Sequence, residues 1–157
     1  MTLTSEQRGA LRDLQAGERV LALSVLVDGE PFAGLLPYAF VPEDGAVLVH
    51  ASRLARHTRG LAPGAQVSVL VHRPDRPEAD PLQIPRVTLQ GEVELLDKNT
   101  AAYRDGQRRY LERFPTSEPT FQLGDFELYR LRFSKGRYVG GFAQAVNVIG
   151  TDLEQLA

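Results

Sequence analysis

Residues 47–61 read Val-Leu-Val-His-Ala-Ser-Arg-Leu-Ala-Arg-His-Thr-Arg-Gly-Leu, and the sequence pattern changes abruptly within this stretch. Its first three residues are two valines and a leucine, which favour a β-strand. Ser52 is a good N-cap residue, and from Leu54 onward the apolar residues recur at helical spacing. The stretch therefore predicts a strand that runs directly into a helix beginning near Arg53.

The start of such a helix is a favourable place for an anion. Its first backbone amides have no intrahelical acceptor and carry the positive end of the helix dipole. Beside them the sequence places the hydroxyl of Ser52, the guanidinium of Arg53 and the imidazole of His57. We expect a phosphate to bind at this corner. From spacing alone, the alternative is a capped helix with exposed arginines.

The composition bounds the class of protein. The chain has 157 residues, of which 43% are hydrophobic and 24% charged. A chain of this size can bury roughly two-thirds of its unfolded surface, which predicts one domain over residues 1–157. The absence of cysteine excludes disulfides and thiolate zinc sites. No apolar signal core and no run of about 18 apolar residues is found, so we expect a cytoplasmic protein outside the membrane.

Basic residues are concentrated in the middle of the chain. Residues 50–90 hold six arginines against three acids, a net charge of +3, whereas the whole chain carries −2. The overall balance argues against a nucleic-acid-binding protein, which would normally carry a basic face. A local basic zone in an acidic chain suits a phosphorylated small molecule.

Turn residues divide the chain into strands. An Asp-Gly pair at 28–29 is a strong hairpin signal between a strand at 20–27 and a second at 31–41. A second turn at 42–45 leads into a third strand at 46–50. These three consecutive strands predict an antiparallel meander.

The rest of the chain adds strands and covering helices. Further strands are expected at 66–72, at 86–96 with a bulge at Gly91, and in two pieces at 126–139 split at Lys135–Gly136; helices are expected at 4–16, 53–62 and 99–114. Long antiparallel strands in a chain of this length close on themselves rather than leave edges exposed. The predicted fold class is mainly β (α+β), a small barrel of six to seven mostly antiparallel strands with flanking helices.

Five segments, taken in chain order, carry a family resemblance. They are Pro31–Ala39, Ser52–Thr58, Pro85–Gly91, Gly124–Arg130 and Val139–Phe142. Together they resemble the pyridoxamine 5′-phosphate oxidase-like superfamily, the FMN-binding split β-barrels. Within it, the Pro-Tyr-Ala and Ser-x-Leu-Ala-x-His-Thr patterns look most like the branch that includes haem-utilisation proteins. Residues 33–37 replace the Arg-x-Val-Leu-Leu-Lys pattern of pyridoxamine phosphate oxidases, which argues against vitamin B6 oxidation.

The resemblance implies a homodimer with FMN at the subunit interface. The segment after the third strand, together with an arginine from the long strand, would hold the phosphate, because a guanidinium fork donates two charge-assisted hydrogen bonds at once. The second strand would lie along the ring edge. The implied cofactor-binding residues are Leu36, Pro37, Tyr38, Ala39, Ser52, Arg53, Leu54, His57, Thr58 and Arg86.

The function implied by the resemblance is that of an FMN-dependent oxidoreductase, which transfers hydride between a reduced nicotinamide and a small substrate. The flavin would carry the chemistry, so no catalytic residue is named. The alternatives are a non-catalytic FMN-binding sensor or carrier, and a haem-binding or haem-degrading relative that uses a histidine as iron ligand. The histidines lack a metal-ligand spacing, and we interpret His50 and His72, which fall on strands, as structural or exposed residues.

Overall fold

The computed structural model describes residues 3–141 and 144–157 and folds them into four α-helices and eight β-strands. The helices are α1 (Ser5–Gly17), α2 (Ala101–Arg113), α3 (Glu118–Phe121) and α4 (Gly150–Glu154). The strands are β1 (Val20–Val27), β2 (Glu30–Pro37), β3 (Ala39–Val41), β4 (Ala46–Ser52), β5 (Gln66–His72), β6 (Arg86–Leu95), β7 (Phe126–Val139) and β8 (Ala145–Ile149). Every strand pair is antiparallel, so the predicted class, mainly β with α+β character, is confirmed.

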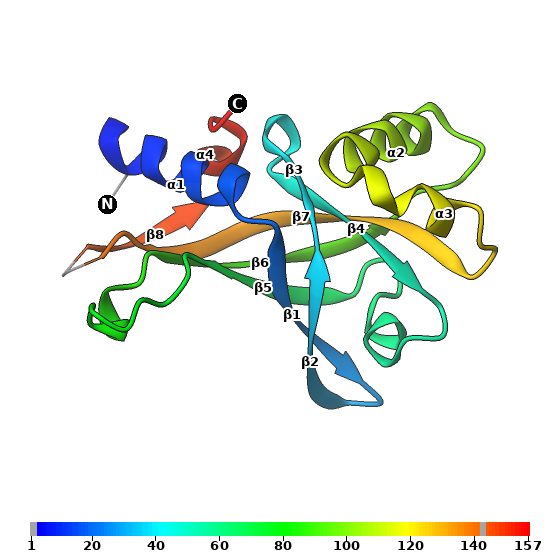
Figure 1. The fold of residues 1–157 in the computed structure, drawn as a ribbon, viewed down its shortest axis with the longest axis horizontal. Coiled ribbons are helices and arrows are strands. Elements are labelled where there is room, and N and C mark those ends of the chain that lie inside the picture. The colour runs from blue at the N-terminus through cyan, green and yellow to red at the C-terminus, as the bar shows by residue number, and fades with distance from the viewer. Residues whose placement is uncertain (1–2, 142–143) are drawn as a thin grey trace.

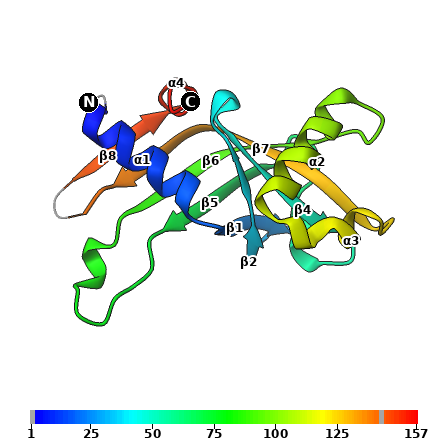
Figure 2. The ribbon, with the colours of Figure 1, turned by 45° about the horizontal axis from the view of Figure 1, so that its top comes forward.

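The strands form one curled sheet. Its hydrogen-bonded order is β2-β1-β5-β6-β7-β4-β3, and β8 pairs with β7 outside that path. Figures 1 and 2 show α1 and α4 over one end of the sheet, and α2 with α3 over the other. The helices therefore cover the ends of the curled sheet.

Closure of the sheet is set by Tyr38. This residue alone separates β2 from β3 in the chain, yet the two strands stand at opposite ends of the sheet order. The sheet must therefore curl until its two edges meet at Tyr38, whose amide donates to the carbonyl of Arg19 over 3.1 Å. The pairings of the expected three-strand meander are formed, but its second strand is broken at Tyr38: β2 pairs with β1, and β3 pairs with β4, which also pairs with β7.

The core fills the inside of the curled sheet. Leu23, Val69 and Leu89, from three neighbouring strands, are at most 2% exposed. A second cluster under α2 contains Leu48 and Leu128. The alternation of inward apolar residues along β1, β5 and β6 explains why the sequence predicted these strands well.

Several local predictions are confirmed. Thr4 caps α1 and forms a capping box with Gln7, and the Asp-Gly pair at 28–29 has the positive φ angles of a tight hairpin. The register of β6 against β7 shifts between Gln90 and Gly91, which is the expected bulge. The end of the resembling segment at Phe142 lies outside the described residues.

Two boundary predictions are wrong. The strand at 126–139 is continuous, because Gly136 lets the carbonyl of Thr88 approach to within 2.3 Å of where a Cβ would stand, so the glycine tightens the pairing of β7 instead of breaking it. The helix expected at 53–62 is not formed. None of the helices in the described ranges combines the length and apolar character needed to cross a bilayer.

We expect Gly91→Ala to lower the free energy of unfolding by about 1–3 kcal/mol, as overpacking does. A Cβ there would stand 1.9 Å from the carbonyl oxygen of Arg132, so the two strands would have to separate. The matched control is Gly9→Ala, because nothing lies within 4 Å of that Cβ position in α1 and alanine favours the helix. Urea denaturation measures both; equal stability of the two variants would contradict the role of the bulge.

Candidate functional site

The predicted phosphate corner has a different backbone from the one expected. After Ser52 the chain makes a turn and then a five-residue 3-10 helix, η2 (Arg56–Gly60). The hydroxyl of Thr58 donates to the carbonyl of Ser52 over 2.6 Å, which holds the segment in a tight loop. The side chain of Leu54 is 86% exposed, so the apolar spacing that suggested a helix does not face a core. A turn this short supplies no appreciable helix dipole.

The side chains of Ser52 and Arg53 at the start of this loop already have carboxylate or carbonyl partners. The hydroxyl of Ser52 donates to Asp125 over 2.5 Å. Arg53 donates to Glu127 over 2.8 Å and to the carbonyl of Gly124 over 3.0 Å. An anion at this corner would have to displace both acids.

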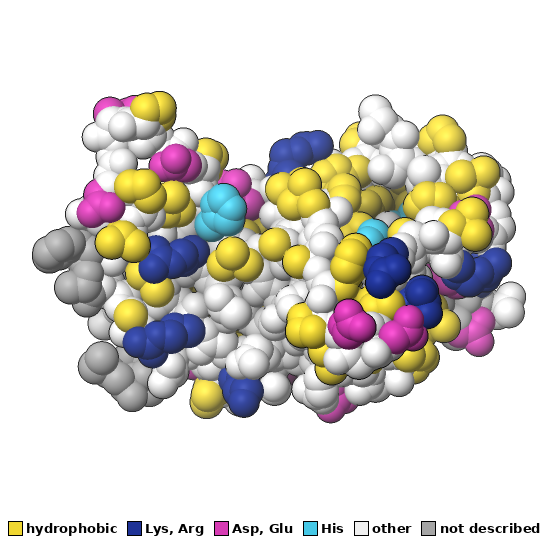
Figure 3. Space-filling view, turned by 90° about the horizontal axis from the view of Figure 1, so that it is seen from below, with side chains coloured by type: hydrophobic (Ala, Val, Ile, Leu, Met, Phe, Trp, Pro, Cys, Tyr) yellow, Lys and Arg dark blue, Asp and Glu magenta, His cyan; other side chains and the backbone are white. Residues whose placement is uncertain are grey.

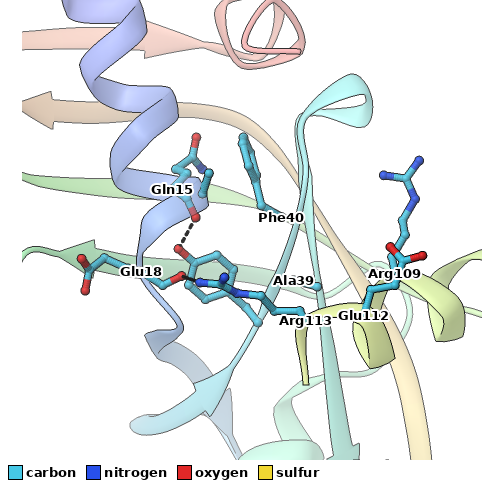
Figure 4. A pocket seen from close by; sticks show the side chains of 9 residues that line it. Gln15, Glu18, Ala39, Phe40, Arg109, Glu112 and Arg113 are labelled. Carbon is cyan, nitrogen blue, oxygen red and sulfur yellow. Dashed lines mark hydrogen bonds between the residues drawn. The ribbon is translucent and has the colours of Figure 1, made fainter. Parts of the chain in front are cut away.

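The predicted residues at the junction of β2 and β3 divide between inside and outside. Leu36, Tyr38 and Ala39 are buried, whereas Pro37 is exposed. The hydroxyl of Tyr38 donates to the carbonyl of Gln15 in α1 over 2.5 Å, beside a cavity of about 360 Å³ between α1, β3 and α2 (Figure 4). Burial raises the pKa of Tyr38 well above its usual value. Tyr38 therefore joins the barrel to α1 and does not face the loop after β4.

Arg86 lies far from the loop after β4 within one chain. Ser52 pairs with Phe126, the first residue of β7, and Arg86 pairs with Val139, the last. Fourteen residues of extended strand separate these ends by about 40 Å. The guanidinium of Arg86 instead donates to the carbonyls of Leu82 and Ile84. One chain does not bring the predicted residues into one site.

His50 is buried and His57 is half-buried. His50 is 6% exposed and stacks on Phe121 with ring centroids 3.8 Å apart, and its Nε2 has no partner among the described residues. Burial, and then the charge of Lys98, lowers the pKa of His50 to about 4. His57 packs against Gly34, its Nε2 is also buried without a described partner, and burial lowers its pKa.

The third histidine, His72, is exposed at the end of β5. Its Nδ1 lies 2.6 Å from the carbonyl oxygen of Arg73, and it stands directly across the strand pair from Arg86. Residues directly opposite in a strand pair share a face, so both side chains project from the sheet on the side away from the core.

The outward side chains of four neighbouring strands form a surface that we call the outer face. Its members are Val20, Ala22, Ser24 and Leu26 of β1, Pro31, Ala33, Leu35 and Pro37 of β2, Ser68, Leu70 and His72 of β5, and Arg86, Thr88 and Gln90 of β6. It is largely apolar on β1 and β2, with Leu35 68% and Leu26 59% exposed. In the sequence, this surface is indicated by the apolar residues at the outward-facing alternate positions of β2. In most antiparallel hairpins these solvent-facing positions are polar.

A curled antiparallel sheet that closes through a single residue, with helices at both ends, defines a split β-barrel. The comparisons agree with this class. The chain superposes with a TM-score of 0.84 on the structure of a "heme binding protein" from Mycobacterium smegmatis, at 25% identity, covering 99% of this chain and 62% of that one. No family model matches the sequence.

Two sequence relatives are named for haem chemistry. "Heme oxygenase HutZ" of Vibrio cholerae is 27% identical over 145 residues, which are 91% of this chain and 81% of that protein. The chloroplastic "non-canonical heme oxygenase HOZ" of Arabidopsis thaliana is 32% identical over 119 residues, but the match covers 34% of its length. The resemblance to the haem-utilisation branch of the split barrels, expected from the sequence, is confirmed.

The same relatives overturn the cofactor prediction. They are named for haem, so the expectation of an FMN-binding flavoprotein that exchanges hydride with a nicotinamide is wrong. The physical basis of that expectation also failed locally, because the helix start that would have bound the FMN phosphate near Arg53 is absent.

Titration of His50 predicts an acid-sensitive fold. The pKa of this histidine is about 4 in the folded state, below its ordinary value of 6.5. Between these two pH values the unfolded chain therefore binds a proton that the folded chain does not bind. Stability is therefore complete above pH 6.5 and falls as the pH drops toward 4, by about 3 kcal/mol in all. His50→Gln should flatten this part of the stability curve, measured by urea denaturation from pH 7 to 4. An unchanged slope would contradict this assignment.

Proposed function

We propose that this chain binds haem as a substrate or cargo in haem utilisation. The similarity to HutZ carries the proposal, because it extends over 91% of the chain. The mycobacterial structural relative, which is also named for haem, supports it. We further propose that residues 1–157 form one haem-binding unit and that the protein is cytoplasmic.

The outer face has the chemistry that a haem requires. A porphyrin needs apolar surface for its macrocycle, cations for its two propionates and a ligand for its iron. Side chains of Val20, Leu35 and Pro37 are exposed on β1 and β2, and Arg86 stands at one margin. Four strands at their usual spacing are about 14 Å across, close to the width of a porphyrin. Of the ten residues predicted to bind a cofactor, Pro37 and Arg86 lie on this face.

A second copy of the chain is the proposed second wall of the site. The outer face is the convex side of the sheet, so a haem lying on one chain would leave its other side in water. Leu26 and Leu35 also expose apolar side chains on this strand pair. Exposed apolar patches of this kind mark surfaces that bind a partner. The homodimer implied by the resemblance would bury these leucines and enclose the porphyrin.

Haem titration of tag-free protein tests the proposal. Adding haemin should produce a sharpened, shifted Soret band that saturates at one haem per chain, and the haem-loaded protein should have the mass of a dimer in solution. Tag-free protein is needed because a histidine tag binds haem itself. A Soret band that remains that of free haemin at all protein concentrations would refute haem binding.

A charge on the β2 part of the outer face should weaken haem binding. We expect Leu35→Asp to raise the haem Kd by tenfold or more, since burial of a leucine contributes about 1.5–3 kcal/mol. The matched control is Leu123→Asp, which changes another exposed leucine before β7 and should leave the Kd unchanged. Both variants should unfold within about 0.5 kcal/mol of the parent chain, because both sites are exposed. Equal Kd values for the two variants would move the site away from this face.

Haem degradation is a second candidate function, favoured by the names of both sequence relatives. Haem-loaded protein supplied with a reductant and oxygen should lose its Soret band over repeated spectra. Catalase in the mixture removes free peroxide, which would otherwise bleach haem without the protein's help. A Soret band that persists under these conditions would leave binding as the function.

A further inference from the structure

We propose that His72 is the axial ligand of the haem iron and that Arg86 pairs with a propionate; this assignment rests on the proposed haem binding. Haem already supplies four nitrogen ligands to its iron, so a single protein side chain is sufficient. The part of the chain that the structure describes has no cluster of three His, Asp or Glu side chains for a bare metal ion. A single exposed histidine could therefore complete the coordination of a haem iron, but it would not be enough to hold a bare metal ion.

The hydrogen bond of His72 fixes the form of its ring. Its Nδ1 lies 2.6 Å from the carbonyl oxygen of Arg73, and a carbonyl oxygen can only accept. Nδ1 therefore carries the proton, and in the neutral ring Nε2 has a bare lone pair. Metal-ligating histidines characteristically use this arrangement, with the other ring nitrogen donating to a carbonyl or carboxylate. The hydrogen bond also orients the imidazole ring, so the side chain loses less conformational entropy when Nε2 binds the iron.

The surroundings of His72 suit a porphyrin. On the outer face, the apolar Leu70 lies two positions back on β5 and pairs with Ala22 of β1. Val20, 45% exposed, lies two positions before Ala22 on the same side of β1. Across the strand pair stands Arg86, whose guanidinium contacts only backbone carbonyls and no carboxylate among the described residues. A positive charge without a carboxylate partner, beside an apolar surface and a nitrogen ligand, matches the propionate, macrocycle and iron of one haem.

The other two histidines are poorly placed. His50 is buried, and His57 is half-buried with its Nε2 closed off from solvent, so a flat macrocycle cannot approach either Nε2 in this arrangement of the side chains. His50 is further covered by Phe121 and Phe126. Seen from below, the molecule shows histidine, basic and acidic side chains among hydrophobic ones (Figure 3).

Spectroscopy of haem-loaded variants tests the assignment. Tag-free parent protein should give absorption and electron paramagnetic resonance spectra of histidine-ligated ferric haem. His72→Gly should lose those features and raise the haem Kd by tenfold or more, and free imidazole should restore the spectrum. Gln66→Ala, at the far end of the same exposed side of β5, should match the parent. Arg86→Ala should weaken binding without changing the histidine features, and Arg86→Lys should recover part of the affinity.

The outcomes separate this inference from the proposed function. If the parent binds haem but His72→Gly keeps the full histidine-ligated spectrum, the assignment of His72 is overturned and haem binding stands. Loss of the spectrum in His57→Gln, with His72→Gly unaffected, would likewise overturn it and name another ligand. If the parent gives no haem spectrum, both the function and the ligand are refuted. His72 is exposed, so its replacement is not expected to unfold the chain.

Discussion

Closure of the sheet through Tyr38 is the constraint on which the rest of the molecule depends. Because one residue joins the two edge strands, the sheet must curl, and its apolar inner side becomes a closed core. The hydroxyl of Tyr38 then binds the last turn of α1 through Gln15. Curling also determines which side chains face outward. On β1 and β2 several outward side chains are apolar, and they remain exposed because they do not reach the core.

The sequence predicted what depends on local patterns. The capping box at Thr4, the hairpin at 28–29 and the bulge at Gly91 each have a short signature with one physical cause, and each is confirmed. The pairing of β4 depends on closure across the barrel, which no local pattern reports. The predicted helix near Arg53 is not formed: helical spacing from Leu54 predicts a buried apolar stripe, whereas this side chain is exposed.

The residues predicted for the site do not come together within one chain. The fold places them at both ends of β7, inside the barrel and in a loop where Ser52 and Arg53 are already paired with acids. Spacing along the chain cannot show that Arg53 faces Glu127, or that Pro37 and Arg86 share one outward face. The position of His72 on a predicted strand indicated a structural or exposed residue, and it is exposed; the proposal that it is a ligand rests on a hydrogen bond and on the residues across the sheet.

Haem binding on the outer face connects three observations made on the described residues: an exposed apolar surface, an arginine that contacts no carboxylate there, and an exposed histidine with a fixed ring. The most direct test is the position of the iron in crystals of the haem-loaded protein, located by its anomalous scattering. The account predicts iron within bonding distance of His72, with the macrocycle over β1 and β5. Iron bound in the loop after β4, or inside the barrel near His50, would contradict it.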